Sequence, residues 1–198
     1  MRIEHFVLGP IGTNTYLLTE GKDALLIDPA SKAEKLIGIL GDYNLIGILL
    51  THGHFDHIKA VDGLYEHYHC PVYLHHDDEY LARDKYAGES FGIVSYITCD
   101  TIHPKQGKTK IGPFEFEVIY TPGHTRGSLI YVFADSIFTG DTLFKGSVGR
   151  TDLDGGDQRQ LKDSLRTFKQ FDKDYNIYPG HEDFSTLSYE LANNPYLY

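Results

Sequence analysis

The amino-acid sequence predicts an α/β-type layered fold, and three observations support this prediction. Short apolar runs rich in Val, Ile, Tyr and Phe recur along the whole chain, which is typical of strands. Segments with helical spacing of apolar residues lie between these runs, as they do in layered folds. The chain has 198 residues without a low-complexity linker, a repeat or a charge block. We therefore expect a single domain over residues 1–198.

Nine segments are expected to be strands. Phe114–Tyr120 alternates apolar with polar residues, which indicates a half-buried strand. Leu45–Leu50 is almost continuously apolar, which indicates a strand covered on both faces. In chain order the expected strands are Ile3–Leu8, Thr15–Thr19, Ala24–Ile27, Ile46–Leu50, Val72–Leu74, Phe114–Tyr120, Ser128–Phe133, Ser136–Phe138 and Asn176–Tyr178.

Five segments between or after the strands are expected to be helices. In the fourth of them, Leu161, Leu165 and Phe168 recur at helical spacing. The glycine-rich segment Gly146–Gly156 is expected to be a long loop, and loops of this kind often carry function. The expected helices are Lys32–Leu40, a stretch from near His57 to about His69, Asp77–Lys85, Asp157–Phe171, and one after Ser185 that ends at Asn194-Pro195.

Charge and composition exclude several classes of protein. The 28 acidic residues exceed the 18 Lys and Arg residues, and the net charge of −10 argues against a nucleic-acid or anionic-membrane partner. No apolar run approaches the roughly 18 residues of a membrane span. Residues Met1–Pro10 lack the apolar stretch of a signal peptide, and the two cysteines have no metal or redox spacing. We therefore expect a cytoplasmic protein.

One pattern occurs four times: an apolar strand ends and possible metal ligands follow at once. In each case a glycine directly before a His or Asp allows a sharp turn and a close approach of the backbone to a bound group. If neighbouring strand ends meet at one edge of the fold, these side chains converge. The four segments are Thr51-His52-Gly53-His54-Phe55-Asp56-His57, Thr121-Pro122-Gly123-His124, Thr139-Gly140-Asp141 and Pro179-Gly180-His181.

The residue types in these segments indicate a site for two metal ions. Side chains at positions i and i+2 of an extended loop point the same way, about 6.5–7 Å apart, so His52 and His54 can reach one ion. Asp56 and His57 follow as the chain turns, and would face a second ion. Imidazole and carboxylate without thiolate suit two divalent ions, Zn²⁺ first and Fe²⁺ or Mn²⁺ as alternatives. Seven candidates suit two ions with a bridging carboxylate: His52, His54, Asp56, His57, His124, Asp141 and His181.

The remaining histidines are expected to serve other purposes. His67 and His69 lie near a predicted helix end, where a cation interacts favourably with the helix dipole. His75 and His76 are adjacent in the sequence, and adjacent side chains of a strand diverge. His5 and His103 stand outside every motif.

The four segments resemble the motifs of the metallo-β-lactamase superfamily, in the right order and over almost the whole chain. Gly140–Phe144, followed by Gly149–Asp152, most resembles glyoxalase II, the hydroxyacylglutathione hydrolases, and their short bacterial relatives. The resemblance implies a four-layer αββα sandwich with a dinuclear site at one edge. By motif position, it implies that Asp141 bridges two metals, the first held by His52, His54 and His124 and the second by Asp56, His57 and His181.

The resemblance also implies a metal-dependent hydrolase of small-molecule thioesters such as a hydroxyacylglutathione, in which a metal-bridging hydroxide attacks the carbonyl. A thiolate leaves without a strong general acid, because the pKa of a thiol is near 8.5. Asp56 is the candidate catalytic residue that orients the hydroxide or takes its proton. Arg150, nine residues after Asp141, is the candidate anchor for a substrate carboxylate, and Lys145 is a second candidate. The alternative for Arg150 is an ion pair with Asp152 or another acid of the loop.

Other functions remain open at this point. Persulfide dioxygenases of the same superfamily use one iron and O₂, so metal content and O₂ consumption would distinguish them from a hydrolase. Another ester or lactone hydrolase is also possible, whereas a β-lactamase is disfavoured by the lack of an export signal and a non-catalytic metal-binding module by the open ligand set. The sequence ends at Tyr198, so we expect no C-terminal segment of the longer glyoxalase II type, which leaves the thiol carrier open. The oligomeric state also stays open.

Overall fold

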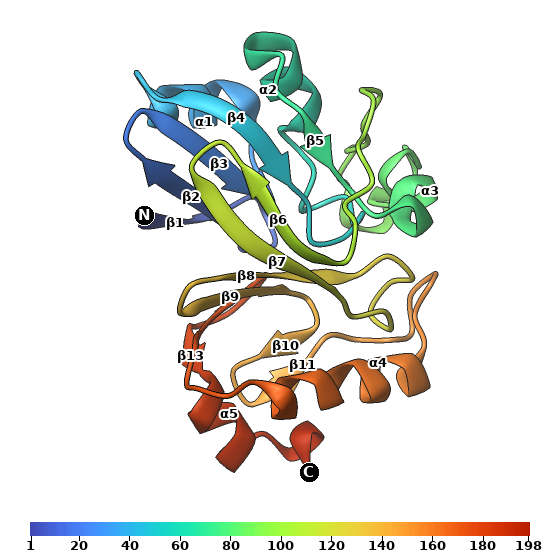
Figure 1. Cartoon of the computed structure of the whole chain (residues 1–198). Helices are drawn as coiled ribbons and strands as arrows, with labels where there is room; N and C mark the ends of the chain where they lie inside the picture. Colours follow the sequence, from blue (N-terminus) through green and yellow to red (C-terminus); the bar gives the residue numbers. More distant parts are fainter.

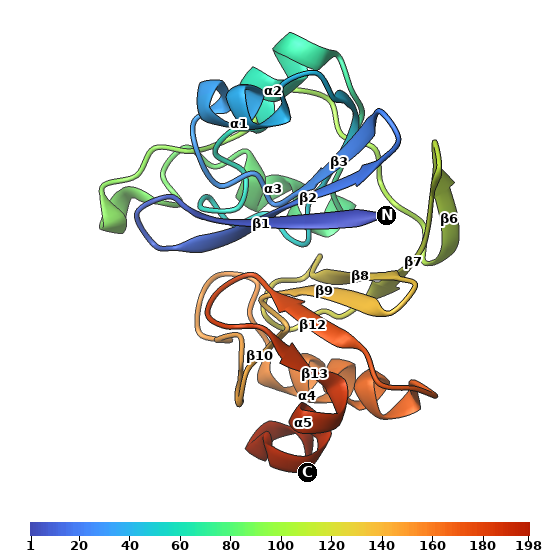
Figure 2. The ribbon, with the colours of Figure 1, turned by 90° about the vertical axis from the view of Figure 1, so that its left-hand side faces the viewer.

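Two β-sheets lie face to face, and helices cover the outer side of each sheet (Figures 1 and 2). The computed structural model describes residues 1–198. Helices α1 (Ala33–Leu40) and α2 (Val61–Tyr68) cover the first sheet, and α4 (Gln158–Leu165) and α5 (Leu187–Asn193) cover the second. The order of layers is therefore αββα, as expected.

The first sheet has five strands. Its first three strands are antiparallel neighbours, and the last three are parallel neighbours joined by crossovers through α1 and α2. In spatial order the strands are β1 (Arg2–Leu8), β2 (Thr13–Glu20), β3 (Asp23–Ile27), β4 (Asn44–Leu49) and β5 (Val72–Tyr73).

The second sheet has six strands, and all neighbouring pairs are antiparallel except β9 and β12. A separate short hairpin is formed by β10 (Leu143–Phe144) and β11 (Ser147–Val148). In spatial order the strands of the sheet are β13 (Ser185–Thr186), β12 (Asn176–Pro179), β9 (Ser136–Gly140), β8 (Leu129–Phe133), β7 (Phe114–Tyr120) and β6 (Gly107–Ile111).

Successive side chains of the central strands serve different layers, because a strand points them alternately to its two faces. Leu26 of β3 belongs to the cluster beneath α1 and α2, whereas its neighbour Leu25 belongs to the cluster between the sheets. In the second sheet Tyr131 faces the first sheet, and its neighbour Ile130 packs in the cluster beneath α4 and α5. Both sheets are thus buried on both faces, which explains the continuous apolar runs of the sequence.

The expected elements are found, with differences at their ends. Helix α2 begins at Val61 rather than near His57, because the His57 amide donates to the His54 carbonyl (3.0 Å) and holds the chain in a turn. The predicted helix Asp157–Phe171 is α4 followed by a tighter 3₁₀ segment, Arg166–Gln170.

Other elements differ in length from the predicted ones or were not predicted. The predicted helix Asp77–Lys85 is a 3₁₀ turn, His76–Asp78, and one turn of helix, α3 (Glu79–Ala82). Strand β6 was not predicted, because its exposed lysines interrupt the alternation of apolar and polar residues that indicates a strand. Such polar residues protect the edge of a sheet from pairing with another chain. Strands β10, β11 and β13 have two residues each, too few to show a period.

The two sheets are joined where the predicted ligand loops leave the strands. The amide of Leu129, in β8, donates to the Thr51 carbonyl (2.9 Å), just beyond β4. The amide of Asn14, in β2, donates to the Gly180 carbonyl (2.7 Å), and the Gly180 amide donates to the Gly140 carbonyl (2.8 Å). These bonds connect the loops after β4, β9 and β12 at one edge of the sandwich. No helix of the structure combines the length and the apolar character needed to cross a bilayer.

Candidate metal centre

The seven predicted ligand residues meet at this edge of the sandwich as two groups of three with one carboxylate between them. The first group, called here the first triad, is His52, His54 and His124, and the second triad is Asp56, His57 and His181. Within each triad, one donor atom per residue lies within 4.8 Å of the others. The grouping is the one that the motif positions imply.

Asp141 lies between the two triads. Its Oδ1 is 3.5 Å from Nε2 of His57, and its Oδ2 is 3.5 Å from Nε2 of His124 and 3.6 Å from Nε2 of His181. One carboxylate therefore faces both groups, which is the position of a bridging ligand.

The hydrogen bonds of three histidines fix which ring nitrogen faces the centre. The Thr51 hydroxyl donates to Asp28 (2.6 Å), so its oxygen must accept the proton of His52 Nδ1 (3.0 Å). In the same way Nδ1 of His57 donates to Asp28 (2.9 Å), and Nδ1 of His124 donates to the carbonyl of Arg150 (2.8 Å). Each ring thus keeps an Nε2 lone pair for a ligand, as metal-binding histidines do.

The electrostatics of the two triads differ. Burial and the neighbouring imidazoles hold the pKa of His52 well below its ordinary value, and burial with His124 lowers the pKa of His54 to about 3. Burial also lowers the pKa of His57, but Asp56, Asp141 and Asp28 outweigh it and raise this pKa to about 10. The surroundings of His52 and His54 therefore disfavour a positive charge, whereas the carboxylates around His57 favour one.

Asp56 keeps its charge although it lies at the centre. Burial raises the pKa of Asp56, but His57 and hydrogen bonds from His181 and Thr13 outweigh it and hold this pKa below its ordinary value. The Thr13 hydroxyl donates to Oδ2 of Asp56 at 2.7 Å. A carboxylate must be deprotonated to bind a metal ion, and Asp56 meets this condition at neutral pH.

Two observations fit the donor set to bound cations. Nε2 of His52 and Oδ1 of Asp141 are buried without any hydrogen-bond partner, which is costly unless another group satisfies them. The loops that carry these residues also approach one another so closely that only glycine fits at two positions. A Cβ at Gly140, whose φ is +48°, would collide with the side chain of Thr51, and a Cβ at Gly180 would collide with the carboxylate of Asp141. The centre therefore has the ligands and the close packing that two divalent ions need.

Sequence reasoning missed Asp28, although one half of the rule, a possible ligand directly after an apolar strand, applies to it. Asp28 follows β3 directly, as the other candidates follow their strands, but no glycine precedes it. It is buried, has a φ of +49°, and accepts from both Thr51 and His57. Asp28 therefore orients a histidine of each triad, one of them through Thr51.

Asp78 was missed as well, and no local signal marks it. Its carboxylate is fully buried and accepts from the amides of Gly53 (2.9 Å) and Gly127 (2.7 Å) and from the Thr125 hydroxyl (2.6 Å). Gly53 lies between His52 and His54 in the sequence, and Thr125 follows His124. Asp78 thus ties together the two loops that supply the first triad.

The expected substrate anchors are both paired in the structure. Arg150 forms two hydrogen bonds with the carboxylate of Asp152, 2.7 and 2.8 Å long, and both side chains are largely exposed. Lys145 pairs with Asp183 at 3.3 Å. Only the backbone carbonyl of Arg150 contacts the centre, through His124. The role of either side chain in binding substrate stays a prediction.

The expectation for His75 and His76 was wrong in its geometry. The two residues lie on a turn rather than a strand, since His75 caps the 3₁₀ segment His76–Asp78. Their rings are 4.4 Å apart, and together with Asp77 their donor atoms lie within 4.8 Å of one another. His67, as expected, lies in the last turn of α2, and His69 ends that helix.

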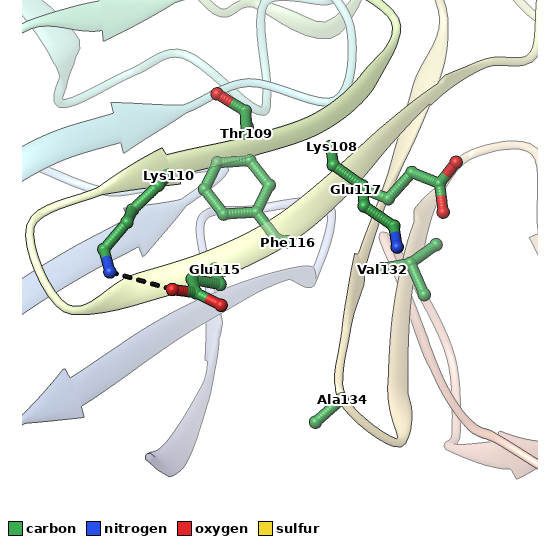
Figure 3. A pocket seen from close by; sticks show the side chains of 8 residues that line it. All are labelled: Lys108, Thr109, Lys110, Glu115, Phe116, Glu117, Val132 and Ala134. Atoms are coloured by element: carbon green, nitrogen blue, oxygen red, sulfur yellow. Dashed lines mark hydrogen bonds and ion pairs between the residues drawn. The ribbon is translucent and has the colours of Figure 1, made fainter.

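The hollow drawn in Figure 3 is separate from the centre. It has a volume of about 690 Å³ and is lined by residues of β6 and β7 with Val132 and Ala134. Lys110 pairs with Glu115 along its floor (2.8 Å), and Phe116 lies beside them. None of the predicted site residues lines it.

Comparisons with known proteins agree with this geometry. A hydroxyacylglutathione hydrolase, GloC of Haemophilus influenzae, is 35% identical over 191 residues, which cover 89% of this chain and 88% of that protein. The crystal structure of the B3 metallo-β-lactamase BLEG-1 is 36% identical, with a TM-score of 0.91 over 99% of both chains. The crystal structure of TTHA1623 in a di-iron-bound form is 35% identical, with a TM-score of 0.91 over 98% of this chain and 100% of that one.

The sequence model of the metallo-β-lactamase superfamily matches residues 8–181, which contain all seven candidate ligands. The fold, the two triads and the relatives agree with this match, and the chain belongs to the metallo-β-lactamase superfamily.

Proposed function

We propose that this protein is a metal-dependent thioester hydrolase of the glyoxalase II type, with a hydroxyacylglutathione as its model substrate. The observation that carries the proposal is the position of Asp141, whose carboxylate faces both triads at 3.5–3.6 Å, with Oδ2 near His124 and His181 and Oδ1 near His57. This arrangement suits two ions that share one carboxylate. The 35% identity to a hydroxyacylglutathione hydrolase supports the choice of substrate.

Each group of ligands has a role in this proposal. His52, His54 and His124 would hold one divalent ion, and the second triad would hold the other, with Zn²⁺ as the first candidate and Fe²⁺ or Mn²⁺ as alternatives. Two such ions supply a water of lowered pKa and a Lewis acid for a carbonyl oxygen.

The protein's own groups then orient the reactants and move a proton. Asp56 is charged at neutral pH, and its hydrogen bond from Thr13 leaves Oδ1 free to accept a proton from water. His57 is fully buried, whereas the side chains of Asp56 and Asp141 are 10% exposed and that of His181 is 20% exposed. A substrate would therefore approach from the side of Asp56, Asp141 and His181 rather than from that of His57.

The leaving group needs little assistance. The products of thioester hydrolysis are a carboxylic acid and a thiolate, and a thiol with a pKa near 8.5 leaves without protonation. The centre accordingly presents Asp56, which is charged at neutral pH, as a proton acceptor.

The proposal is tested by measuring metal content together with activity. The purified protein is loaded with Zn²⁺, Fe²⁺ or Mn²⁺, its metal is counted per chain, and S-lactoylglutathione hydrolysis is followed by absorbance. We expect about two ions per chain and hydrolysis that a chelator abolishes and added metal restores. Lys108→Gln, at the separate hollow on β6, is the control that should behave as wild type.

Two parallel assays can overturn the proposal. One iron per chain with O₂ uptake on glutathione persulfide, and no thioester hydrolysis, would identify a dioxygenase instead. Hydrolysis of a β-lactam without thioester hydrolysis would indicate a β-lactamase, as the structural relative BLEG-1 is named. Full metal content with no turnover of any of these substrates would favour a metal-binding module.

A further inference from the structure

A pocket of about 400 Å³ opens beside the second triad, and one of its walls is Asp56 itself. Phe55, next in sequence to Asp56, lies in the same wall, and Pro10 and Val94 contribute apolar surface from two other loops. The pocket therefore shares a wall with the metal centre, on the side where Asp56 is accessible.

Three lysines line this pocket, and we call it the lysine pocket. Lys32 and Lys35 come from the start of α1, and Lys59 from the turn before α2. The first two make no ion pair and no side-chain hydrogen bond, while Lys59 donates to the carbonyl of Val94 across the pocket. Asp56 is the one acidic residue in the lining, and Thr13 and His181 already engage it.

This concentration of positive charge is unusual for the chain. The protein carries a net charge of −10, yet three lysines that form no ion pair gather at one apolar pocket next to the metal centre. The backbone amides in the first turn of α1 add partial positive charge, because the N-cap residue Lys32 has no side-chain cap, and the acidic Glu34 of this turn does not line the pocket. An apolar floor with a cationic rim is the environment that an organic anion prefers.

We propose that the lysine pocket binds the carboxylate-bearing thiol portion of the thioester substrate. The inference rests on the proposed function and names the part of the substrate that this pocket recognises. The volume of about 400 Å³ far exceeds what a short hydroxyacyl group fills, and pockets of this size hold ligands of tripeptide size. The carbonyl would lie at the triads and the thiol's tail would run over Phe55 to the lysines.

The pocket explains substrate binding better than the loop residues expected from the sequence. Arg150 and Lys145 are each neutralised by a neighbouring acid, Asp152 and Asp183. Lys32 and Lys35 have no such partner, so their charge is available to a ligand. The specificity for an anionic thiol is thus assigned to α1 and to the turn before α2.

The experiment compares two thioesters with the same acyl group. S-lactoylglutathione has carboxylates on its thiol portion, and the S-lactoyl ester of N-acetylcysteamine has none. We expect the triple variant Lys32→Gln, Lys35→Gln, Lys59→Gln to raise KM for the glutathione ester about 10-fold or more, since three positive charges near its two carboxylates are lost. The kcat should stay within about 2-fold, and kcat/KM for the neutral ester should not change. Equal changes for both esters, or an unchanged KM, would overturn the proposal.

A binding measurement separates this proposal from the proposed hydrolysis. S-methylglutathione has both carboxylates but no thioester bond and no free thiol, so calorimetric titration reports the pocket whether or not the protein hydrolyses thioesters. We expect it to bind wild type and Lys108→Gln equally, more weakly at high salt, and at least about 10-fold more weakly to the triple variant. Equal affinity for wild type and the triple variant would overturn the lysine pocket even if S-lactoylglutathione is hydrolysed.

Discussion

The carboxylate of Asp28 lies 2.9 Å from Nδ1 of His57 and also accepts the hydroxyl of Thr51 at 2.6 Å. Thr51 in turn accepts from His52, so one buried carboxylate orients a histidine of each triad. The second oxygen of Asp28 accepts the Thr51 amide at 2.8 Å. The two halves of the centre therefore depend on a residue that belongs to neither.

Replacement of Asp28 should impair metal binding although Asp28 is not among the predicted ligands. Asp28→Asn keeps the size but loses the charge that faces His57, and we expect metal affinity to fall about 10–100-fold. Metal retained after dialysis against a weak chelator measures the effect. Thr51→Ser keeps the hydroxyl and is the matched control, expected to retain its metal. Full retention by Asp28→Asn would show that the ligands hold their positions unaided.

Two ligand variants should differ in how much metal they lose. His54→Ala removes a ligand of the first triad alone, so the second triad keeps its set, whereas Asp141→Ala removes the carboxylate that faces both. We expect both variants to lose hydrolysis, with Asp141→Ala retaining less metal per chain. Elemental analysis alongside the S-lactoylglutathione assay checks this. Equal metal content in Asp141→Ala and wild type would exclude Asp141 as a bridge.

Asp78 should contribute strongly to stability. Asp78→Ala leaves two buried amides and the Thr125 hydroxyl without their acceptor, so the free energy of unfolding should fall by about 3–5 kcal/mol. Urea denaturation of the metal-free protein measures this. The adjacent, exposed Asp77 is the control, since Asp77→Ala should change stability by less than about 0.5 kcal/mol. Similar urea midpoints for Asp78→Ala and Asp77→Ala would contradict the stabilising role of Asp78.

Variants of Arg150 and Asp152 test whether the loop after β11 contributes to substrate binding. Because Asp152 already neutralises the guanidinium, we expect Arg150→Ala to raise KM for S-lactoylglutathione by less than the triple lysine variant does. Asp152→Asn frees Arg150 and should lower this KM if the side chain reaches the substrate. An unchanged KM in both variants would remove Arg150 from the binding site.

The sequence alone determined the set of candidate ligands and the class of fold. Each ligand lies in a short segment where an apolar strand ends, and both the strand and the turn are local features of a few residues. The motifs in which His52, His124, Asp141 and His181 stand identify the superfamily because their order along the chain is as informative as their composition.

Only the tertiary structure decided which groups support those ligands. Asp78 contacts residues 25 and 49 positions away, and His57 meets Asp28 across 29 positions, so no local pattern encodes either contact. The pairing of Arg150 and the open charge of Lys32 and Lys35 likewise depend on which loops the packed sheets bring together. The side-chain chemistry that suits a residue to bind a metal ion is visible in the sequence. Its orientation depends on residues that are distant in the sequence and come into contact only on folding.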